Sequence, residues 1–251
     1  MLIPPEFVRA VRDASGIVVL TGAGVSAESG IPTFRDPQEG LWAKYDPAEL
    51  ATPEAYSRDP ELVTRWYDWR RGKCAAAKPN PAHRALAWLE RFCGEGERRF
   101  TLVTQNVDRL HHAAGSTRIL ELHGTLWIWR CMHCGQGCEE REVPFAEYPP
   151  RCDCGGMRRP GVVWFGESLP EGVLEAANLA ASECDLFLSI GTSAVVYPAA
   201  GLAHSARRHG AQVAEINAQP TPLSPMTDWS LQGRCGEILP ELLTLAFGFQ
   251  P

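Results

Sequence analysis

The sequence predicts an α/β protein in which a Rossmann-like parallel sheet is flanked by helices. Three observations support this fold class. Short continuous apolar runs alternate with segments of helical periodicity, a pattern typical of strands that are buried on both faces of a parallel sheet. A glycine-rich turn directly follows the first apolar run, and polar residues follow several later ones. The 251 residues, 45% of them hydrophobic, suffice to bury one large core.

The expected strands are short and mainly apolar: 16–20, 100–104, 119–122, 186–190 and 213–216. Helical periodicity occupies other stretches of the chain: 5–14, 60–77, 81–92, 107–114, 171–183, 198–209 and 237–247. Strands that alternate with helices in this way indicate α/β architecture.

Two segments break this alternation within a single domain. Residues 33–95 hold helical patterns without a convincing strand, which predicts a helical insertion. Residues 125–160 are rich in Cys, Gly and Pro, which predicts a small module that needs a stabilising element besides its own apolar core. The Rossmann-like part then comprises about 1–32, 96–124 and 161–251.

Charge and composition argue against several classes of protein. The net charge of −6 and the pI of about 5.7 disfavour nucleic-acid binding, which usually requires a basic face. No apolar run is long enough to span a bilayer, and residues 1–12 lack the apolar region of a signal peptide. We therefore expect a cytoplasmic protein, in which the nine cysteines do not form a disulfide framework.

The turn after the first strand has the pattern G-x-G-x-x-A. Gly22 permits a tight turn, and Gly24 lets the backbone approach a pyrophosphate without a Cβ in the way. Backbone N–H groups there can hold phosphates. The candidate cofactor contacts are Gly22, Ala23, Gly24, Ser26 and Ala27. On this motif alone, a glycine turn without a ligand is an equal alternative.

The loop after this turn departs from the ordinary dinucleotide fingerprint. No second strand with an acidic end follows, which argues against a standard dehydrogenase. Instead, residues 30–36 include Phe34 and Arg35, and a loop of this length beside a phosphate site can close over a cofactor.

Polar residues follow the later strands where each one ends. Ligands of open α/β sheets bind beyond the carboxyl ends of the strands, so these residues are candidate site residues. Each one alone is more often a helix cap or a turn residue, but their repetition at one edge favours a site. They are Gln105, Asn106, Asp108, His123, Gly191, Thr192, Ser193 and Asn217.

A cysteine cluster in residues 125–160 predicts a zinc site. Cys131 and Cys134 have C-x-x-C spacing, whereas Cys152 and Cys154 form a tighter C-x-C pair. Four thiolates can hold zinc tetrahedrally and leave no open position for water, so we expect a structural metal. His133 and Cys138 are alternatives for one ligand.

Several of these motifs together resemble the sirtuin family. The matching segments are 22–26, 30–35, 104–108, 122–124, 162–167 and 191–193, and the match runs from about residue 10 to residue 245. The resemblance implies one sirtuin-type domain that uses NAD and an acyl-lysine. It also implies three products: free lysine, nicotinamide and an O-acyl-ADP-ribose. Acyl-lysine proteins or peptides are the implied partners.

The resemblance also implies roles for individual residues. His123 is the expected general base on a ribose hydroxyl, which suits an imidazole that titrates near neutral pH; a satisfied core histidine is the structural alternative. Asn106 is expected to orient the ribose or a water, and Asp108 to bind the nicotinamide amide. Phe34 would shield the reacting ribose carbon from water, and Arg35 would contact a phosphate or the closing loop.

Two further segments of the match carry expected contacts. Residues 162–167 are expected to pair with the substrate backbone by β-augmentation, through Val163, Trp164 and Phe165; a buried strand is the alternative. Residues 233–236 resemble the turn that sirtuins place against adenine, which makes Cys235 a cofactor contact.

Tyr67 and Arg70 lie three residues apart on one helix face. An amphipathic surface helix would by itself explain them. Within the sirtuin framework, the pair resembles the branch that removes succinyl and malonyl groups, and Ala51 occupies a position where that branch keeps a small residue. A guanidinium can bind the acyl carboxylate bidentately, so we expect succinyl-lysine to be preferred over acetyl-lysine.

Two other functions compete with deacylation. An NAD-dependent ADP-ribosyltransferase would use the same activated ribose, but the Tyr67/Arg70 pair favours an acyl substrate. A non-catalytic NAD-sensing or zinc-dependent binding module has no need of His123 and Asn106 beside the ribose. We expect a monomer that binds neither membranes nor nucleic acid.

Overall fold

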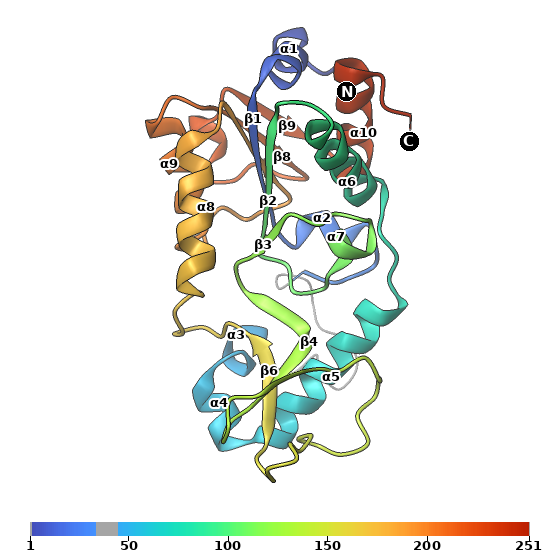
Figure 1. The fold of residues 1–251 in the computed structure, drawn as a ribbon, viewed down its shortest axis with the longest axis vertical. Helices are drawn as coiled ribbons and strands as arrows, with labels where there is room; N and C mark the ends of the chain where they lie inside the picture. Colours follow the sequence, from blue (N-terminus) through green and yellow to red (C-terminus); the bar gives the residue numbers. More distant parts are fainter. Residues whose placement is uncertain (1, 34–44, 251) are drawn as a thin grey trace.

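The computed structural model describes residues 2–33 and 45–250. Within them, a six-stranded sheet in which all neighbouring strands are parallel forms the larger part, in the order β3-β2-β1-β7-β8-β9 (Figure 1). The strands are β1 (Gly16–Thr21), β2 (Arg99–Thr104), β3 (Ile119–Glu121), β7 (Leu186–Ile190), β8 (Gln212–Asn217) and β9 (Trp229–Gln232). The predicted fold class is confirmed.

The strand order creates a switch point between β1 and β7. The chain moves outward from β1 through β2 to β3, and later returns to β7 on the other side of β1. Thr21 pairs with Thr104 on one side and with Ile190 on the other, so three strands end at the same level. A doubly wound sheet binds its ligand in the crevice at this point.

Helices cover both faces of the sheet. One face packs against α1 (Pro5–Asp13), α6 (Pro81–Gly94) and α10 (Cys235–Phe247), and the other against α8 (Glu171–Glu183) and α9 (Gly201–Arg208) (Figure 1). The sequence placed α6 in the helical insertion. Its buried Ala85, Leu86 and Leu89 nevertheless belong to the core of the large sheet.

The smaller part lies beyond the carboxyl edge of the large sheet (Figure 1). It contains α3 (Pro47–Leu50), α4 (Pro53–Arg58) and α5 (Pro60–Ala76), together with an antiparallel sheet of β5 (Gly137–Glu139), β4 (Gly124–Cys131) and β6 (Arg158–Val162). A separate apolar cluster, which includes Trp66, Leu126 and Trp129, forms its core.

Some local predictions differ from the structure. The antiparallel sheet and β9 are absent from the predicted strands, because β9 is an edge strand with only Leu231 buried and β4 is irregularly paired with β6. The helix expected over 107–114 is reduced to α7 (Leu110–Ala113). Arg109 has φ 63°, and Asp108 Oδ1 accepts a hydrogen bond from the Leu110 N–H, so the helix begins only there.

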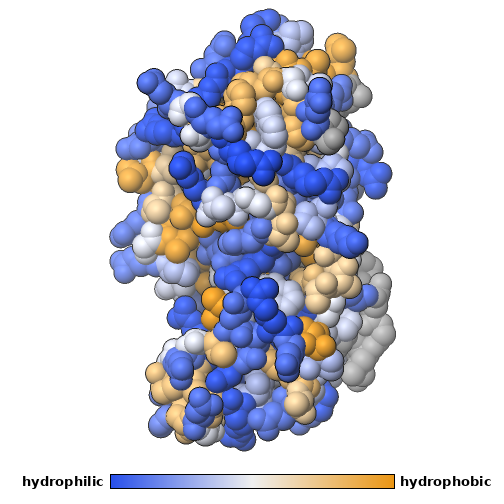
Figure 2. Space-filling model, turned by 45° about the vertical axis from the view of Figure 1, so that its right-hand side comes forward, coloured by the Kyte–Doolittle hydropathy of each residue, from blue (hydrophilic) through white to orange (hydrophobic). Residues whose placement is uncertain are grey.

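Figure 2 shows hydrophilic residues over much of one face of both parts, with hydrophobic groups near the upper end of the view and around the narrower middle. In residues 2–33 and 45–250, no helix is long and apolar enough to cross a membrane.

The core packing makes a testable prediction. Leu102 is fully buried in the middle of β2, so Leu102→Ala is expected to lower the free energy of unfolding by about 2–5 kcal/mol through lost burial and a residual cavity. Urea denaturation measures the change. Leu179→Ala on the exposed side of α8 is the matched control and is expected to change it by no more than about 0.5 kcal/mol. Equal effects of the two substitutions would contradict this account of the core.

Candidate active site

The glycine turn after β1 packs directly against the loop after β7. The Gly24 N–H donates to the Gly191 carbonyl at 2.8 Å, and the Gly22 N–H donates to the Ile190 carbonyl at 3.1 Å. A Cβ on Gly24 would lie 2.8 Å from Gly191 Cα and from its carbonyl oxygen. Glycine is therefore required at position 24 for backbone contact between two loops.

This contact occupies two of the N–H groups that the sequence offered to phosphates. The amides of Gly22 and Gly24 donate to the end of β7, so a phosphate would be bound by other donors at the turn. Ala23 is the N-cap residue of the short α2 (Gly24–Ala27), which contains the buried Ser26.

Ser26 connects the turn to the polar residues that follow β2. Asn106 Nδ2 donates to Ser26 Oγ at 3.0 Å, and Ser26 Oγ donates to Asp108 Oδ2 at 2.8 Å. All three side chains are buried, and burial raises the pKa of Asp108. The structure therefore brings three of the predicted site residues into one network.

Two buried histidines extend this network and were missed from the sequence. His83 Nε2 lies 3.4 Å from Ser26 Oγ, and His111 Nε2 lies 3.0 Å from Thr21 Oγ1. Burial lowers the pKa of His83 to about 4 and that of His111 well below its ordinary value, so both imidazoles are neutral at pH 7. His83 also forms the capping box of α6 with Asn80. Because this local role alone accounts for a histidine at this position, the sequence gives no sign of its contact with Ser26.

His123 lies just before β4 with a defined tautomer. Its Nδ1 is 3.1 Å from the Gln105 carbonyl oxygen, which can only accept, so Nδ1 carries the proton and Nε2 keeps a lone pair. Burial lowers the pKa of His123, which leaves the ring neutral at pH 7. The Val163 N–H donates to the His123 carbonyl at 2.9 Å, so the predicted peptide-binding segment starts beside this histidine.

The far side of the crevice is formed by the ends of β7 and β8. Asn217 Nδ2 donates to the Thr192 carbonyl at 2.6 Å, and the Thr192 and Ser189 hydroxyls are 3.0 Å apart. Ser193 follows Thr192 in the same loop and is half-buried. Together with the Gly24–Gly191 contact and the Asn106–Ser26 bond, these bonds connect the loops after β1, β2, β7 and β8.

Cys235 begins α10 beside this edge. Its thiol is buried and lies 3.8 Å from the Ile216 carbonyl oxygen, and burial raises its pKa to about 12. The neighbouring Gly236 N–H donates to Glu28 Oε1 at 2.8 Å, which joins α10 to the end of α2. Glu28 was not predicted, because a single acidic residue after the turn carries no sequence signal of this distant contact.

The donor set at the switch point fits a dinucleotide. Hydroxyl and amide side chains suit ribose hydroxyls, phosphate oxygens and a carboxamide, and five of them lie along the connected loops: Ser26, Asn106, Thr192, Ser193 and Asn217. Phe34 and Arg35, also predicted as cofactor contacts, lie outside the described residues.

The predicted acyl-binding residues surround the middle of α5. Trp164 Nε1 donates to the Tyr67 hydroxyl oxygen at 2.9 Å, and both side chains are buried. Burial raises the pKa of Tyr67 to about 12, so its hydroxyl keeps a proton to donate. The Arg70 guanidinium lies 5.9 Å from the Tyr67 ring centroid and lines a pocket with Trp66, Trp69 and Ile31.

The segment predicted to bind the substrate peptide is fixed to α3 and α5. Phe165 is half exposed, and its N–H donates to the carbonyl of the buried Ala51 at 2.9 Å. The Trp164 ring packs in the same apolar cluster as Ala51 and Tyr67, so this side chain is a core residue as well as part of the segment.

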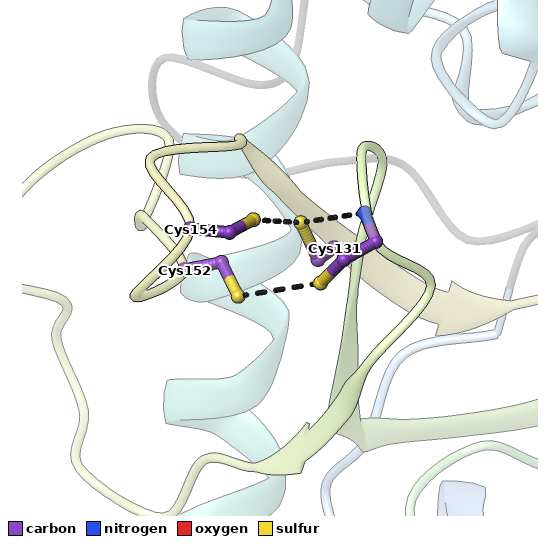
Figure 3. Close-up of side chains that lie close together, drawn as sticks. Cys131, Cys152 and Cys154 are labelled. Atoms are coloured by element: carbon purple, nitrogen blue, oxygen red, sulfur yellow. Dashed lines mark hydrogen bonds between the residues drawn. The ribbon is translucent and has the colours of Figure 1, made fainter.

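Four cysteines converge at the end of the smaller sheet. Figure 3 shows Cys131, Cys152 and Cys154 with their sulfur atoms close together; Cys131 Sγ lies 3.5 Å from Cys154 Sγ, and Cys134 Sγ lies 3.7 Å from Cys152 Sγ. All four sulfur atoms are within 4.8 Å of one another. Thiolates about 2.3 Å from a tetrahedral zinc ion lie about 3.8 Å apart, so the cluster fits zinc.

The two side chains that the sequence offered as alternative zinc ligands, Cys138 and His133, do not belong to this cluster. The Cys138 thiol lies 3.8 Å from the Glu139 carbonyl oxygen, and the His133 backbone N–H donates to Cys131 Sγ at 3.4 Å. Among the residues that the structure describes, the group able to hold a metal contains neither side chain.

A Rossmann-like sheet with hydroxyl, amide and imidazole groups at its carboxyl edge, next to a four-cysteine module, defines a zinc-bearing nucleotide-binding α/β protein. The sequence model of the Sir2 family matches residues 22–198. The chain belongs to the Sir2 family, the sirtuins.

Known proteins similar to this chain agree with that assignment. "NAD-dependent protein deacylase 1" of Pseudomonas aeruginosa is 52% identical over 248 residues, which cover 96% of this chain and 98% of the relative. "NAD-dependent protein deacylase" of Aquifex aeolicus is 53% identical over 213 residues, which cover 84% of this chain and 87% of the relative.

Two solved structures are similar over nearly the whole chain. A complex of a Sir2 homologue with NAD has a TM-score of 0.92 and 46% identity, covering 98% of this chain and 94% of that one. A Sir2 complex with a deacetylated p53 peptide and 3′-O-acetyl-ADP-ribose has a TM-score of 0.86 and 31% identity, covering 98% of both chains.

The cysteine geometry predicts which thiols retain zinc. Cys134→Ser is expected to reduce the bound zinc below one ion per chain, because it removes one of four ligands. Cys138→Ser is the matched control and is expected to keep one ion. Elemental analysis of the purified proteins measures both. Loss of zinc from the Cys138 variant with retention in the Cys134 variant would overturn the ligand assignment.

Proposed function

We propose that this sirtuin removes succinyl and malonyl groups from protein lysine side chains, and acetyl groups more slowly. The chain is an NAD-dependent protein deacylase of the Sir2 family, with NAD as cofactor and a cysteine cluster that fits structural zinc. The free thiols suit a reducing compartment, and we further propose a cytoplasmic location.

The observation that best supports the proposed acyl specificity is the position of Arg70, which lines a pocket beside Tyr67. A guanidinium can bind the terminal carboxylate of a succinyl or malonyl group through two hydrogen bonds. The Tyr67 hydroxyl accepts from Trp164 and so has its own proton left for the same carboxylate. Ala51 is buried in the same apolar cluster as Tyr67, and a small side chain there is the feature that resembles the desuccinylase branch.

The acyl pocket is electrostatically connected to the buried polar network. The positive charge of Arg70 lowers the pKa of Asp108, opposing the larger effect of burial. In turn, the carboxylate of Asp108 favours the charged form of Arg70, whose pKa burial lowers. We infer that the acyl carboxylate and the reacting groups occupy neighbouring positions.

Bound NAD would supply an electrophilic ribose carbon and nicotinamide as the leaving group. In the proposed reaction, His123 Nε2 accepts a proton from a ribose hydroxyl, and the Gln105 carbonyl holds the ring in the required tautomer. Asn106 orients the ribose or a water, and Asp108 binds the carboxamide of nicotinamide. The segment at Val163–Phe165 pairs with the peptide backbone and keeps the acyl-lysine in place.

The acyl preference can be tested by the substitution Arg70→Met. The expected result is a decrease in kcat/KM for a succinyl-lysine peptide on the order of 100-fold, because the carboxylate then enters a site without its cationic partner. NAD-dependent deacetylation of the matched acetyl-lysine peptide is expected to persist.

Arg9→Met on α1 is the control, since Arg9 is exposed and pairs with Glu6 far from this pocket. An unchanged acyl preference in the Arg70 variant would refute the proposed specificity. Labelled NAD in the same reactions separates deacylation, which leaves the label on a small molecule, from ADP-ribosylation of protein.

The pKa of His123 predicts the pH dependence. A general base acts in its neutral form, and burial lowers its pKa from 6.5. We therefore expect kcat/KM to rise as pH increases through this lowered pKa and to be level near pH 7. His123→Ala is expected to lower kcat/KM at least about 100-fold and to abolish this rise. The control is His209→Ala, because exposed His209 makes the same Nδ1–carbonyl contact far from the site. A rise centred above pH 6.5 would contradict the assignment.

A further inference from the structure

A buried ion pair occupies the middle of α5 beside the acyl-binding residues. Arg71 Nη1 donates to Asp68 Oδ1 at 2.8 Å, and the two side chains are only 0% and 3% exposed. Asp68 and Arg71 directly follow Tyr67 and Arg70 in the sequence, so the two pairs project from neighbouring strips of one helix.

Both members of the ion pair are anchored to the segment 139–148 of the smaller part. Arg71 Nη2 donates to the carbonyls of Glu140 at 2.7 Å and Glu142 at 2.9 Å. Asp68 Oδ2 accepts from the Phe145 N–H at 3.0 Å and from the Tyr148 hydroxyl at 2.6 Å. The ion pair therefore makes four hydrogen bonds to a segment that lies about 70 residues away in sequence.

The segment 139–148 is itself attached to the antiparallel sheet. The Glu140 N–H donates to the Trp127 carbonyl at 2.8 Å, and the Glu140 carboxylate pairs with Arg158 at 2.5 Å. The guanidinium of Arg71 also lies 4.1 Å from the Phe145 ring centroid. Because both ends of this connection are held, a rotation of α5 would break charged hydrogen bonds in a buried region.

A contribution to the stability of the fold does not by itself explain why an ion pair is buried at this position. Desolvation of two charges offsets much of their attraction, and apolar residues of similar volume often stabilise a protein as well. Directional bonds to four separate groups do what apolar packing does not: they specify one rotation of the helix about its axis. From the neighbouring strip of the helix, the Tyr67 hydroxyl accepts a hydrogen bond from Trp164, so α5 is bonded to the segment 163–165 as well.

We propose that Asp68 and Arg71 are specificity-determining positioning residues, which fix the rotation of α5 and so place Tyr67 and Arg70 for a negatively charged acyl group. The proposal rests on the acyl specificity proposed above. A displacement of about 1 Å at such a contact can cost about 100-fold in rate, so small rotations of the helix matter. An acetyl group lacks a carboxylate and depends less on this placement.

Two variants test this proposal: Arg71→Lys and Tyr148→Phe. Lysine keeps the charge but cannot bridge Asp68 and two carbonyls with a planar fork. We expect its kcat/KM for succinyl peptide to fall about tenfold, mainly through KM, with kcat/KM for acetyl peptide and KM for NAD changing less than about twofold. Tyr148→Phe removes one hydroxyl from Asp68 and is expected to shift the succinyl-to-acetyl ratio in the same direction, about threefold.

The control is Glu6→Gln, which breaks the exposed Glu6–Arg9 pair on α1 and is expected to leave the ratio unchanged. A thermal melt establishes folding of each variant, and Tyr148→Phe decides the question if Arg71→Lys does not fold. Equal losses for both acyl groups, or an unchanged ratio in folded variants, would overturn the positioning role alone. A wild-type enzyme without succinyl preference would overturn the proposed specificity, and this inference with it.

Discussion

The backbone contact between Gly24 and Gly191 is the constraint on which the rest of the site depends. It arises because β1 and β7 are neighbours across the switch point of the sheet, so the loops that leave their carboxyl ends meet. With no Cβ at position 24, the two loops approach within hydrogen-bonding distance. This contact brings Ser26 on one side and Thr192 on the other to the same crevice, where the polar ends of β2 and β8 join them.

Burial determines the electrostatic character of this crevice. His83, His111 and His123 all have lowered pKa values for the same reason, because an imidazolium ion loses its hydration when it is enclosed. The carboxyl group of Asp108 shows the opposite shift, which hydrogen bonds from Ser26 and the Leu110 N–H partly offset. The resulting site holds several titratable groups with little charge among its imidazoles, and it is suited to a substrate that brings its own charges.

Three kinds of interaction, each in a different place, hold the smaller part together. Four thiolates suited to zinc close one end of the antiparallel sheet, an apolar cluster around Trp129 fills its interior, and the Asp68–Arg71 pair binds the segment 139–148 to α5. A segment rich in Gly and Pro has too few apolar residues to be held by burial alone, which explains why ligation and charged hydrogen bonds supplement it. On α5, the Tyr67 hydroxyl also accepts a hydrogen bond from Trp164, which ties this helix to the segment 163–165.

The sequence by itself determined the parallel sheet, the turn after β1 and the cysteine pairs. Each depends on residues close together in the chain: strands buried on both faces are continuously apolar, and chelating cysteines come in short spacings. Only the tertiary structure decided which polar groups form hydrogen bonds with one another. It assigned the Gly22 and Gly24 amides to β7, brought His83 and His111 to the network, added β9 and the antiparallel sheet, and paired Asp68 with Tyr148. These contacts join residues tens of positions apart, and the free energy of burying a polar group depends on a partner that no local pattern specifies.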